Sequence, residues 1–218
     1  MGYSKVEICN LALLSIGQET IQSLTESSQE AVYCAAFYDS ARKQLLRGHP
    51  WNFATKIVEL AALTEDPPDF TYYYGIPSDC IKVIGPIYAA NSAAESSANS
   101  VYYPNDLGDY NPRAKVKEVK FELRSDAAGN KVLATDEEEF YLQYVYDCDD
   151  PNRYDATFVD AFSYLLASKL AGPITGDMNI VNQMLNTYRS LLPEAESNDA
   201  SEGNEEDYSG QSFVEARN

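Results

Sequence analysis

The chain has 218 residues, which is enough to bury a sizeable core in one domain or in two small ones. Its formal net charge of −18 excludes a module that grips nucleic acid through the phosphates, because that affinity comes from Lys and Arg. The first residues lack a basic region followed by a long apolar run, so neither a signal peptide nor a membrane span is expected.

Two amphipathic helices are predicted at the start of the chain. Ser4 and Glu7 form the pattern of a capping box, and apolar residues recur at helical spacing from there until Gly17. The same pattern at Ser27 and Glu30 predicts the start of a second helix with one apolar face. We therefore expect the chain to open with a pair of helices.

A sharp corner is predicted where the second helix ends. Gly48 suits the left-handed conformation that closes a helix, and Pro50 cannot continue one because it lacks an N–H group. The corner holds the single histidine of the chain, His49, and its single tryptophan, Trp51, followed by Phe53. We expect the two large rings to be buried between the helix and a strand, so the corner is interpreted as a packing device and not as a catalytic site.

The middle of the chain is predicted to be β structure. Apolar and aromatic residues alternate with polar ones at the period of a strand, and a turn is expected at Asp126–Asn130. The last two strands flank this turn, which predicts a hairpin or a meander. The expected strands are Thr55–Ala61, Phe70–Tyr74, Ile81–Ile84, Val119–Leu123 and Phe140–Tyr146.

A long irregular segment interrupts these strands. Residues 85–112 are rich in Asn, Ser, Ala and Gly and cannot form a packed element of their own. They are either an exposed loop or a projecting interaction loop, because Tyr102, Tyr103 and Tyr110 offer contact area at low entropic cost. The stretch 91–100 matches no motif, so its role stays open.

Helical signals return after the β segments. Asp155 is a suitable cap for a third helix, which Gly172-Pro173 is expected to end. A fourth helix is predicted from about Asp177 to Leu192, with apolar residues at helical spacing. Together with the first pair, these helices can complete a four-helix bundle.

The residues beyond Pro193 have a different composition. They include eight Asp or Glu residues and one Arg, and so supply seven of the eighteen net negative charges. They contain few large apolar residues and cannot bury enough surface to offset the entropy lost on ordering. We expect this tail to be disordered in the free monomer.

These elements predict an α+β fold. A discontinuous four-helix bundle is expected from residues 1–54 and 148–192, which are the N- and C-terminal segments. An inserted antiparallel β module, residues 55–147, lies between them in the sequence. An extended acidic C-terminal tail, residues 193–218, completes the predicted organisation.

No cofactor and no metal site is predicted. Cys9, Cys34, Cys80 and Cys148 lack the spacing of zinc ligands or of a disulfide framework. The first two fall on apolar helix faces, where a thiol behaves as a small hydrophobe. Neither of the glycine-rich patterns that hold nucleotide phosphates occurs in the chain.

Clustered carboxylates leave one enzymatic alternative. A hydrolase with paired acid and base would be sought at Asp136–Glu139, or at Asp147, Asp149 and Asp150. The same three aspartates lack the full spacing of an EF-hand, which disfavours a calcium site. Runs of charge are usually solvated faces or helix caps, so we expect a protein without enzymatic activity.

Several segments share their order and spacing with one family of virus proteins. Together they resemble the head-to-tail adaptor (connector) proteins of tailed bacteriophages, of the tail tubular protein A type found in short-tailed phages. The segments are Asn10–Gly17, Ile21–Leu24, Tyr38–Ala54, Ile76–Cys80, Phe158–Phe162, Leu166–Ala171 and Gly210–Arg217.

This resemblance implies a structural virion protein. It implies a subunit of a dodecameric ring, docked beneath the portal protein and receiving the tail tube or nozzle on its other side. Genome DNA would pass through the ring's channel during ejection without specific binding, and no membrane would be involved. The protein would reside at the head–tail junction of the virion, and in the host cytoplasm during assembly.

The resemblance also implies a role for the C-terminal extension, which in such adaptors reaches along the portal. On this chain the portal-binding residues would be Tyr208, Phe213, Val214 and Arg217. The 17 tyrosines agree with a protein that binds through its surfaces, since Tyr is enriched at protein interfaces. A peptidoglycan-cleaving carboxylate hydrolase of the phage tail and an acidic mimic of DNA remain the alternatives.

Overall fold

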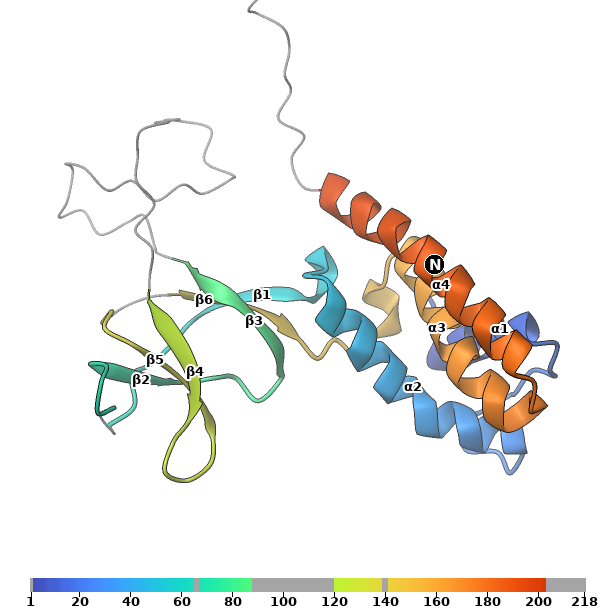
Figure 1. The fold of residues 1–218 in the computed structure, drawn as a ribbon, viewed down its shortest axis with the longest axis horizontal. Coiled ribbons are helices and arrows are strands. Elements are labelled where there is room, and N and C mark those ends of the chain that lie inside the picture. The colour runs from blue at the N-terminus through green and yellow to red at the C-terminus, as the bar shows by residue number, and fades with distance from the viewer. Residues whose placement is uncertain (1, 65–66, 88–119, 139–140, 203–218) are drawn as a thin grey trace, which may run out of the picture.

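The computed structural model describes residues 2–64, 67–87, 120–138 and 141–202. Within these ranges the chain is a mixed α+β fold with four α-helices and two small antiparallel sheets, which confirms the expected fold class. The helices gather at one end of the molecule and the sheets at the other (Figure 1). The chain passes between the two ends at the α2–β1 corner and again after β6.

Helices from both ends of the sequence pack together. The third helix, α3, packs against each of the other three, so segments more than a hundred residues apart share one core. The helices are α1 (Lys5–Ser15), α2 (Gln29–Gly48), α3 (Ala156–Thr175) and α4 (Met178–Ser201).

Short polar side chains start the helices. The capping box at α1 is confirmed: the Glu7 N–H donates to Ser4 Oγ at 3.1 Å, and the Ser4 N–H donates to the Glu7 carboxylate at 2.7 Å. The cap of α2 is Ser28 and not Ser27, because Ser28 Oγ accepts from the Ala31 N–H. Asp155 caps α3, as predicted from the sequence.

The second helix ends at the predicted position but not in the predicted conformation, and the predicted end of the third helix is wrong. Gly48 does not adopt a left-handed conformation; α2 ends there because His49 turns to an extended backbone at φ −129° and ψ 148°. The third helix does not end at Gly172-Pro173 but continues through Pro173 to Thr175. Proline is tolerated in this last turn, and the left-handed residue that closes the helix is Gly176, with φ 67°.

The predicted end of the fourth helix is also too early. α4 continues through Pro193 to Ser201, so the first residues of the expected disordered tail are helical. Ala195 and Asp199 are buried and extend the inward-facing spacing of Met184 into the last turns. Burial of that face accounts for the additional length of the helix. Residues 203–218 lie outside the described part of the chain.

The strands form two sheets of three. One sheet has the order β1-β6-β3 and the other the order β2-β5-β4, and all pairings are antiparallel. The strands are β1 (Thr55–Glu59), β2 (Tyr72–Gly75), β3 (Cys80–Ile87), β4 (Phe121–Ser125), β5 (Lys131–Thr135) and β6 (Tyr141–Tyr146).

The predicted turn is confirmed, but it joins β4 to β5, a strand that was not predicted, and not to the expected strand Phe140–Tyr146. The turn is fixed by Asp126, whose carboxylate accepts from the Asn130 N–H at 2.7 Å, and by Gly129 with φ 84°. A meander is not formed, because β6 leaves this sheet and inserts between β1 and β3. After β6 the chain returns directly to the helices (Figure 1).

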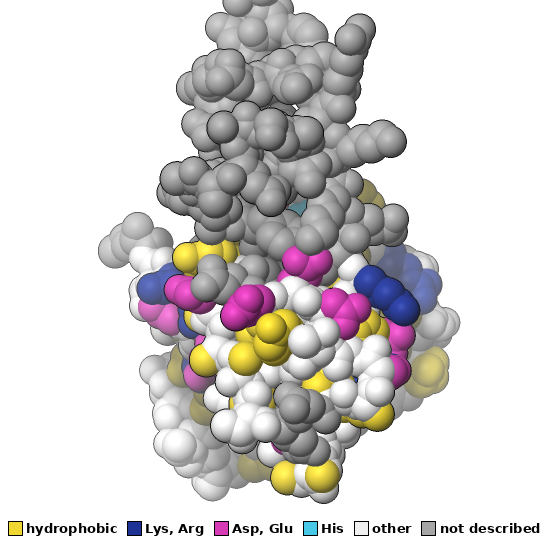
Figure 2. Space-filling view, turned by 90° about the vertical axis from the view of Figure 1, so that its left-hand side faces the viewer, with side chains coloured by type: hydrophobic (Ala, Val, Ile, Leu, Met, Phe, Trp, Pro, Cys, Tyr) yellow, Lys and Arg dark blue, Asp and Glu magenta, His cyan; other side chains and the backbone are white. Residues whose placement is uncertain are grey.

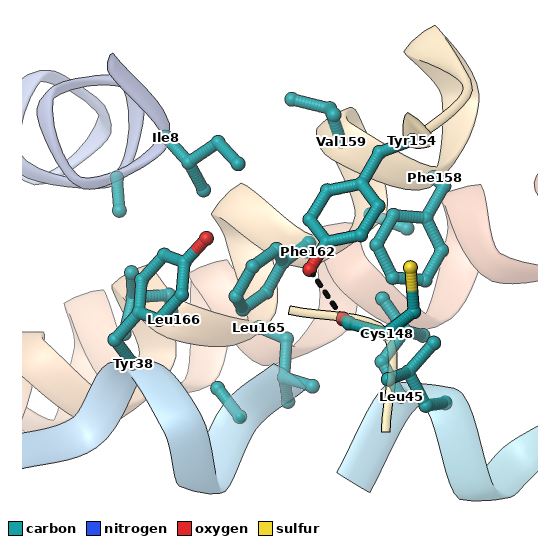
Figure 3. Close-up of a cluster of buried hydrophobic side chains, with 14 of the residues drawn as sticks. Ile8, Tyr38, Leu45, Cys148, Tyr154, Phe158, Val159, Phe162, Leu165 and Leu166 are labelled. Carbon is teal, nitrogen blue, oxygen red and sulfur yellow. Dashed lines mark hydrogen bonds between the residues drawn. The ribbon is translucent and has the colours of Figure 1, made fainter. Parts of the chain in front are cut away.

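The main core lies on α3. Phe158, Phe162, Leu165 and Leu166 project from α3 toward side chains of α1 and α2, and all are buried (Figure 3). The core also takes in Cys9 and Cys34, which are buried as expected for apolar helix faces. A small second cluster lies at the β2-β5-β4 sheet and consists of Phe70, Tyr73, Val132 and Ala134.

Candidate assembly surfaces

The corner between α2 and β1 is built around a buried tryptophan. The Trp51 side chain is only 1% exposed, and its ring meets Phe158 of α3 edge to face, with 4.9 Å between ring centroids. Its Nε1–H donates to the Leu45 carbonyl of α2 at 3.2 Å. Phe53 packs on the same Phe158 ring and on Tyr154. These contacts fix the direction in which the chain leaves α2 and enters the sheet.

The last turns of α4 are fastened to this corner by Asp199. Its buried carboxylate accepts from the backbone N–H of Asn52 at 2.9 Å and lies 3.0 Å from His49 Nε2. The Asn52 side-chain amide in turn donates to the Asp199 carbonyl. We call these three residues the corner latch. It joins positions about 150 residues apart and places the end of α4 beside the entrance to the β module.

The sequence pattern does not predict the corner latch, because the composition beyond Pro193 indicates a disordered tail. One signal was present: Met184, Tyr188, Ala195 and Asp199 follow the 3.6-residue spacing of a continuous helix face. A carboxylate that faces inward requires a hydrogen-bond donor. The single histidine of the chain, at the corner, is a side chain that can supply one. His49 thus serves as a partner of Asp199 in this fold.

Replacing Asp199 with Ala is expected to release the end of α4. The change leaves the Asn52 N–H, which donates in a partly buried hydrogen bond, without its acceptor, and this costs about 0.5–1.5 kcal/mol. Hydrogen–deuterium exchange should show faster exchange of the amides of residues 195–201, while the amides of α3 keep their protection. Asn198→Ala, at an exposed neighbouring position, is the control and should leave exchange unchanged. Equal exchange in both variants would contradict the latch.

A second group of residues ties the helices to the β module. Arg42 of α2 is buried, at 2% exposure, and its Nη1 donates to the Cys148 carbonyl at 2.7 Å. The same nitrogen lies 2.5 Å from the Asp147 carboxylate, and Nε lies 3.5 Å from that of Asp149. Lys43 reaches the other oxygen of Asp147 at 3.1 Å. The segment leaving β6 is therefore held against α2 by a buried guanidinium.

The charge balance at this junction favours ionised Asp147. Burial by itself raises the pKa of this carboxyl, but the hydrogen bonds from Lys43 and Arg42 outweigh burial and hold the pKa below its ordinary value of 3.8. Lys5 of α1 adds a 2.7 Å ion pair with Asp149. The aspartates considered for calcium binding are thus occupied by cations of the protein.

An open pocket of about 290 Å³ lies at the same junction. The two carboxylates that line it, Asp149 and Asp150, are both bound by neighbouring residues. Asp149 is bound to Lys5, and Asp150 accepts from Asn152, a hydrogen bond that lowers the pKa of Asp150. A general acid requires the opposite shift. The pocket is lined by Lys56, Tyr146, Cys148, Asp149, Asp150 and Arg153.

In the other proposed carboxylate cluster, Asp136–Glu139, Asp136 has a structural role, while Glu139 lies outside the described residues. Asp136, just after β5, accepts from the backbone N–H and the hydroxyl of Thr71 at 2.9 and 3.0 Å, which fastens the start of β2. Across the described ranges, no three His, Cys, Asp or Glu side chains are arranged to hold a metal ion. Nor does any described helix combine the length and apolar character needed to cross a membrane.

Several large apolar side chains project into solvent. In the helices Val32 of α2 is 57% exposed, Met178 of α4 is 63% exposed, and Leu14 of α1 is 58% exposed. In the sheets, Ile57 of β1 and Leu123 of β4 are equally open. Figure 2 shows the β end of the molecule, where hydrophobic and acidic side chains lie side by side. Single exposed apolar side chains on separate elements are ordinary on a protein surface, and only a contiguous apolar patch would indicate a contact with another protein.

The other predicted binding residues cannot be placed. Tyr102, Tyr103 and Tyr110 of the interaction loop, and Tyr208, Phe213, Val214 and Arg217 of the portal-binding tail, lie outside the described residues. No protein-family model matches the chain, and no curated protein shows significant similarity to it. The assignment of function therefore depends on the fold, its surfaces and the sequence pattern.

Proposed function

We propose that this chain is a subunit of a head-to-tail adaptor ring of a tailed bacteriophage. In this role it joins the portal to the tail tube or nozzle and surrounds part of the channel through which DNA is ejected. The observation that carries the proposal is the connection of two modules by fixed joints. The helices of both chain ends share one core, the corner latch ties α4 to the corner that precedes β1, and Arg42 ties α2 to the segment that leaves β6.

Rigid joints suit a part that transmits force between two larger assemblies. A loosely connected pair of domains would move relative to one another by default, whereas buried polar contacts at both crossings oppose such motion. In the proposed ring the four helices form the discontinuous bundle, and neighbouring subunits are held by surfaces with exposed apolar side chains such as Val32 and Met178. Twelve copies would close the ring, and the protein would lie in the virion at the head–tail junction.

The acidic character of the chain fits a channel for DNA. A ring of subunits that each carry a net charge of −18 can present to the genome a wall of like charge. DNA then slides without being held, since the cations that bind phosphates are scarce. A ring structure with a lumen lined mainly by Lys and Arg would contradict this part of the proposal.

The proposal is tested by negative-stain electron microscopy of the full chain with and without a portal protein from the same phage. We expect rings of this chain bound to portals, and at saturating concentrations of the chain every portal should carry a ring. A monodisperse monomer that leaves portals bare under all conditions would overturn the proposal. A chain truncated after Glu202 keeps all helices and strands described here, and should bind portals more weakly if the C-terminal residues make the portal contact.

A further inference from the structure

Two of the cysteines lie side by side inside the helical module. Cys9 of α1 and Cys34 of α2 are free thiols with no exposed surface, and both belong to the main core. A hydrogen bond joins the two thiols. Neither residue takes part in the corner latch or in the contacts of Arg42, so the proposed function makes no use of this pair.

The packing of α1 against α2 places the two sulfurs opposite each other. Lys5 is one turn before Cys9, and its Nζ atom lies 5.7 Å from the ring centroid of Tyr38, which is one turn after Cys34. Figure 3 shows the Tyr38 side chain pointing from α2 toward α1, where Ile8 lies. A step forward along α1 thus corresponds to a step back along α2. The two helices are antiparallel here, with Cys9 facing Cys34.

Small side chains continue this antiparallel register. The next position inward on α1 is Ala12, and the corresponding position on α2 is Ala31; both are fully buried. Short side chains at a helix contact allow a small distance between the helix axes. A disulfide requires Cα atoms about 4.4–6.8 Å apart, a distance that closely packed helices can provide. The contact between α1 and α2 therefore has the side chains that a cross-link requires.

We propose that Cys9 and Cys34 form a disulfide when the folded chain meets a peroxide, so that oxidation cross-links α1 to α2. A metal site is not favoured, because within the described ranges no third His, Cys, Asp or Glu side chain joins the pair. Nor is a disulfide between copies favoured, since neither sulfur reaches the surface. This inference goes beyond the proposed adaptor function and does not depend on it.

The reaction balances with one molecule of hydrogen peroxide. The hydrogen bond from Cys9 lowers the pKa of Cys34, whereas the same bond and burial raise the pKa of Cys9, so Cys34 is the sulfur that ionises. Its thiolate attacks one peroxide oxygen, the O–O bond breaks, and the departing hydroxide takes up a proton to form water. The Cys9 sulfur then attacks the resulting sulfenic acid of Cys34. The S–O bond breaks, and the hydroxyl leaves with the Cys9 proton as a second water.

The cross-link is expected to stabilise the helical module. It closes a loop of chain that contains the segment 16–28 between α1 and α2, and a closed loop restricts the unfolded chain more than the folded one. For a loop of about 25 residues, the melting temperature should rise by about 5–10 °C. Thiols persist in a reducing cytoplasm, so the chain would gain this stabilisation only in an oxidising environment.

The test treats the full chain with hydrogen peroxide under native conditions and then alkylates the remaining thiols. Cleavage after glutamate separates the two cysteines, because Glu19, Glu26 and Glu30 lie between them. Mass spectrometry without reduction should find the fragments of Cys9 and Cys34 joined to each other. Reduction should release both fragments and return the melting temperature to that of the untreated chain.

Variants of the four cysteines provide the controls. C80A/C148A removes the other two thiols and keeps the pair, so it should show the same cross-link and the same rise in melting temperature. Cys9→Ala and Cys34→Ala each remove one partner and should show no rise on oxidation. Because a buried Cys→Ala change can itself lower stability, each variant is compared with its own reduced form.

Three results would overturn the inference. They are Cys9 and Cys34 that remain free thiols when the partly exposed Cys80 is fully oxidised, a disulfide that pairs either of them with Cys80 or Cys148, and a cross-link that forms only after urea has unfolded the chain. The binding of rings to portals is measured separately, so failure of this inference and failure of the adaptor function are distinguished.

Discussion

Replacing Arg42 with Met is expected to lower the free energy of unfolding by about 2–4 kcal/mol. The buried guanidinium is the donor for the Cys148 carbonyl and the closest cation to Asp147. Removing one partner of a buried ion pair costs about 3–5 kcal/mol, and the lower figure expected here reflects the solvent access of Asp147, which is 28% exposed. Urea unfolding at pH 7, followed by tryptophan fluorescence, measures the change.

The neighbouring lysine provides a matched control. Lys43 binds the same carboxylate but is 53% exposed, so Lys43→Met should cost less than about 1 kcal/mol. Equal losses in the two variants would show that burial of the cation does not matter. That result would contradict the role given to Arg42 at the junction.

The Arg42→Met variant should also have a weaker dependence of stability on acid. The pKa of Asp147 is lowered in the folded state, so this carboxylate stabilises the fold above its ordinary pKa of 3.8, and the contribution is lost as the pH falls through the lowered value. Without Arg42 the pKa of Asp147 lies closer to 3.8. Urea unfolding between pH 5 and about pH 2 should therefore show a smaller loss of stability in the variant than in the parent chain.

Replacing Trp51 with Ala is expected to lower the free energy of unfolding by about 3–5 kcal/mol. The indole is buried at 1% exposure between α2 and α3, and truncation of such a ring removes its transfer free energy and leaves a cavity beside Phe158. The Leu45 carbonyl also loses the Nε1–H donor. Because Trp51 is the fluorophore, circular dichroism replaces fluorescence as the probe of unfolding.

Trp51→Phe separates packing from the hydrogen bond. Phenylalanine keeps a ring against Phe158 but cannot donate to the Leu45 carbonyl, so we expect a loss of about 1–2 kcal/mol. If Trp51→Ala were no more destabilising than Trp51→Phe, the corner would not depend on the filled volume. The interpretation of the corner as a packing device would then be wrong.

Both residues act at places where the chain crosses between the helices and the sheets. Trp51 fixes the first crossing, from α2 to β1, and Arg42 fixes the second, from β6 toward α3. The corner latch adds the end of α4 to the first crossing. These contacts hold the helices and the sheets in a fixed relation to each other, as the proposed adaptor function requires.

Local signals in the sequence determined much of the secondary structure. Three of these signals depend only on groups within a few residues of each other, so they do not require any distant part of the chain. They are the capping box of Ser4 and Glu7, the Asp155 cap and the Asp126–Asn130 turn. The mixed α+β class follows from the same local periodicities. The resemblance to adaptor proteins also comes from the sequence, whereas the fixed joints that support the proposed function come from the fold.

Tertiary contacts decided what those signals could not. The spacing of Ala195 and Asp199 allows α4 to continue past Pro193 but does not require it. The helix continues to Ser201 because Asp199 accepts hydrogen bonds at a corner 147 residues earlier in the chain. Likewise the place of β6 between β1 and β3, and the burial of Arg42 against the segment after β6, depend on pairings across the whole chain. Local sequence determines which helices and strands form. Buried polar groups require hydrogen-bond partners, and where those partners are distant in the sequence, the tertiary structure determines where the elements end and how they join.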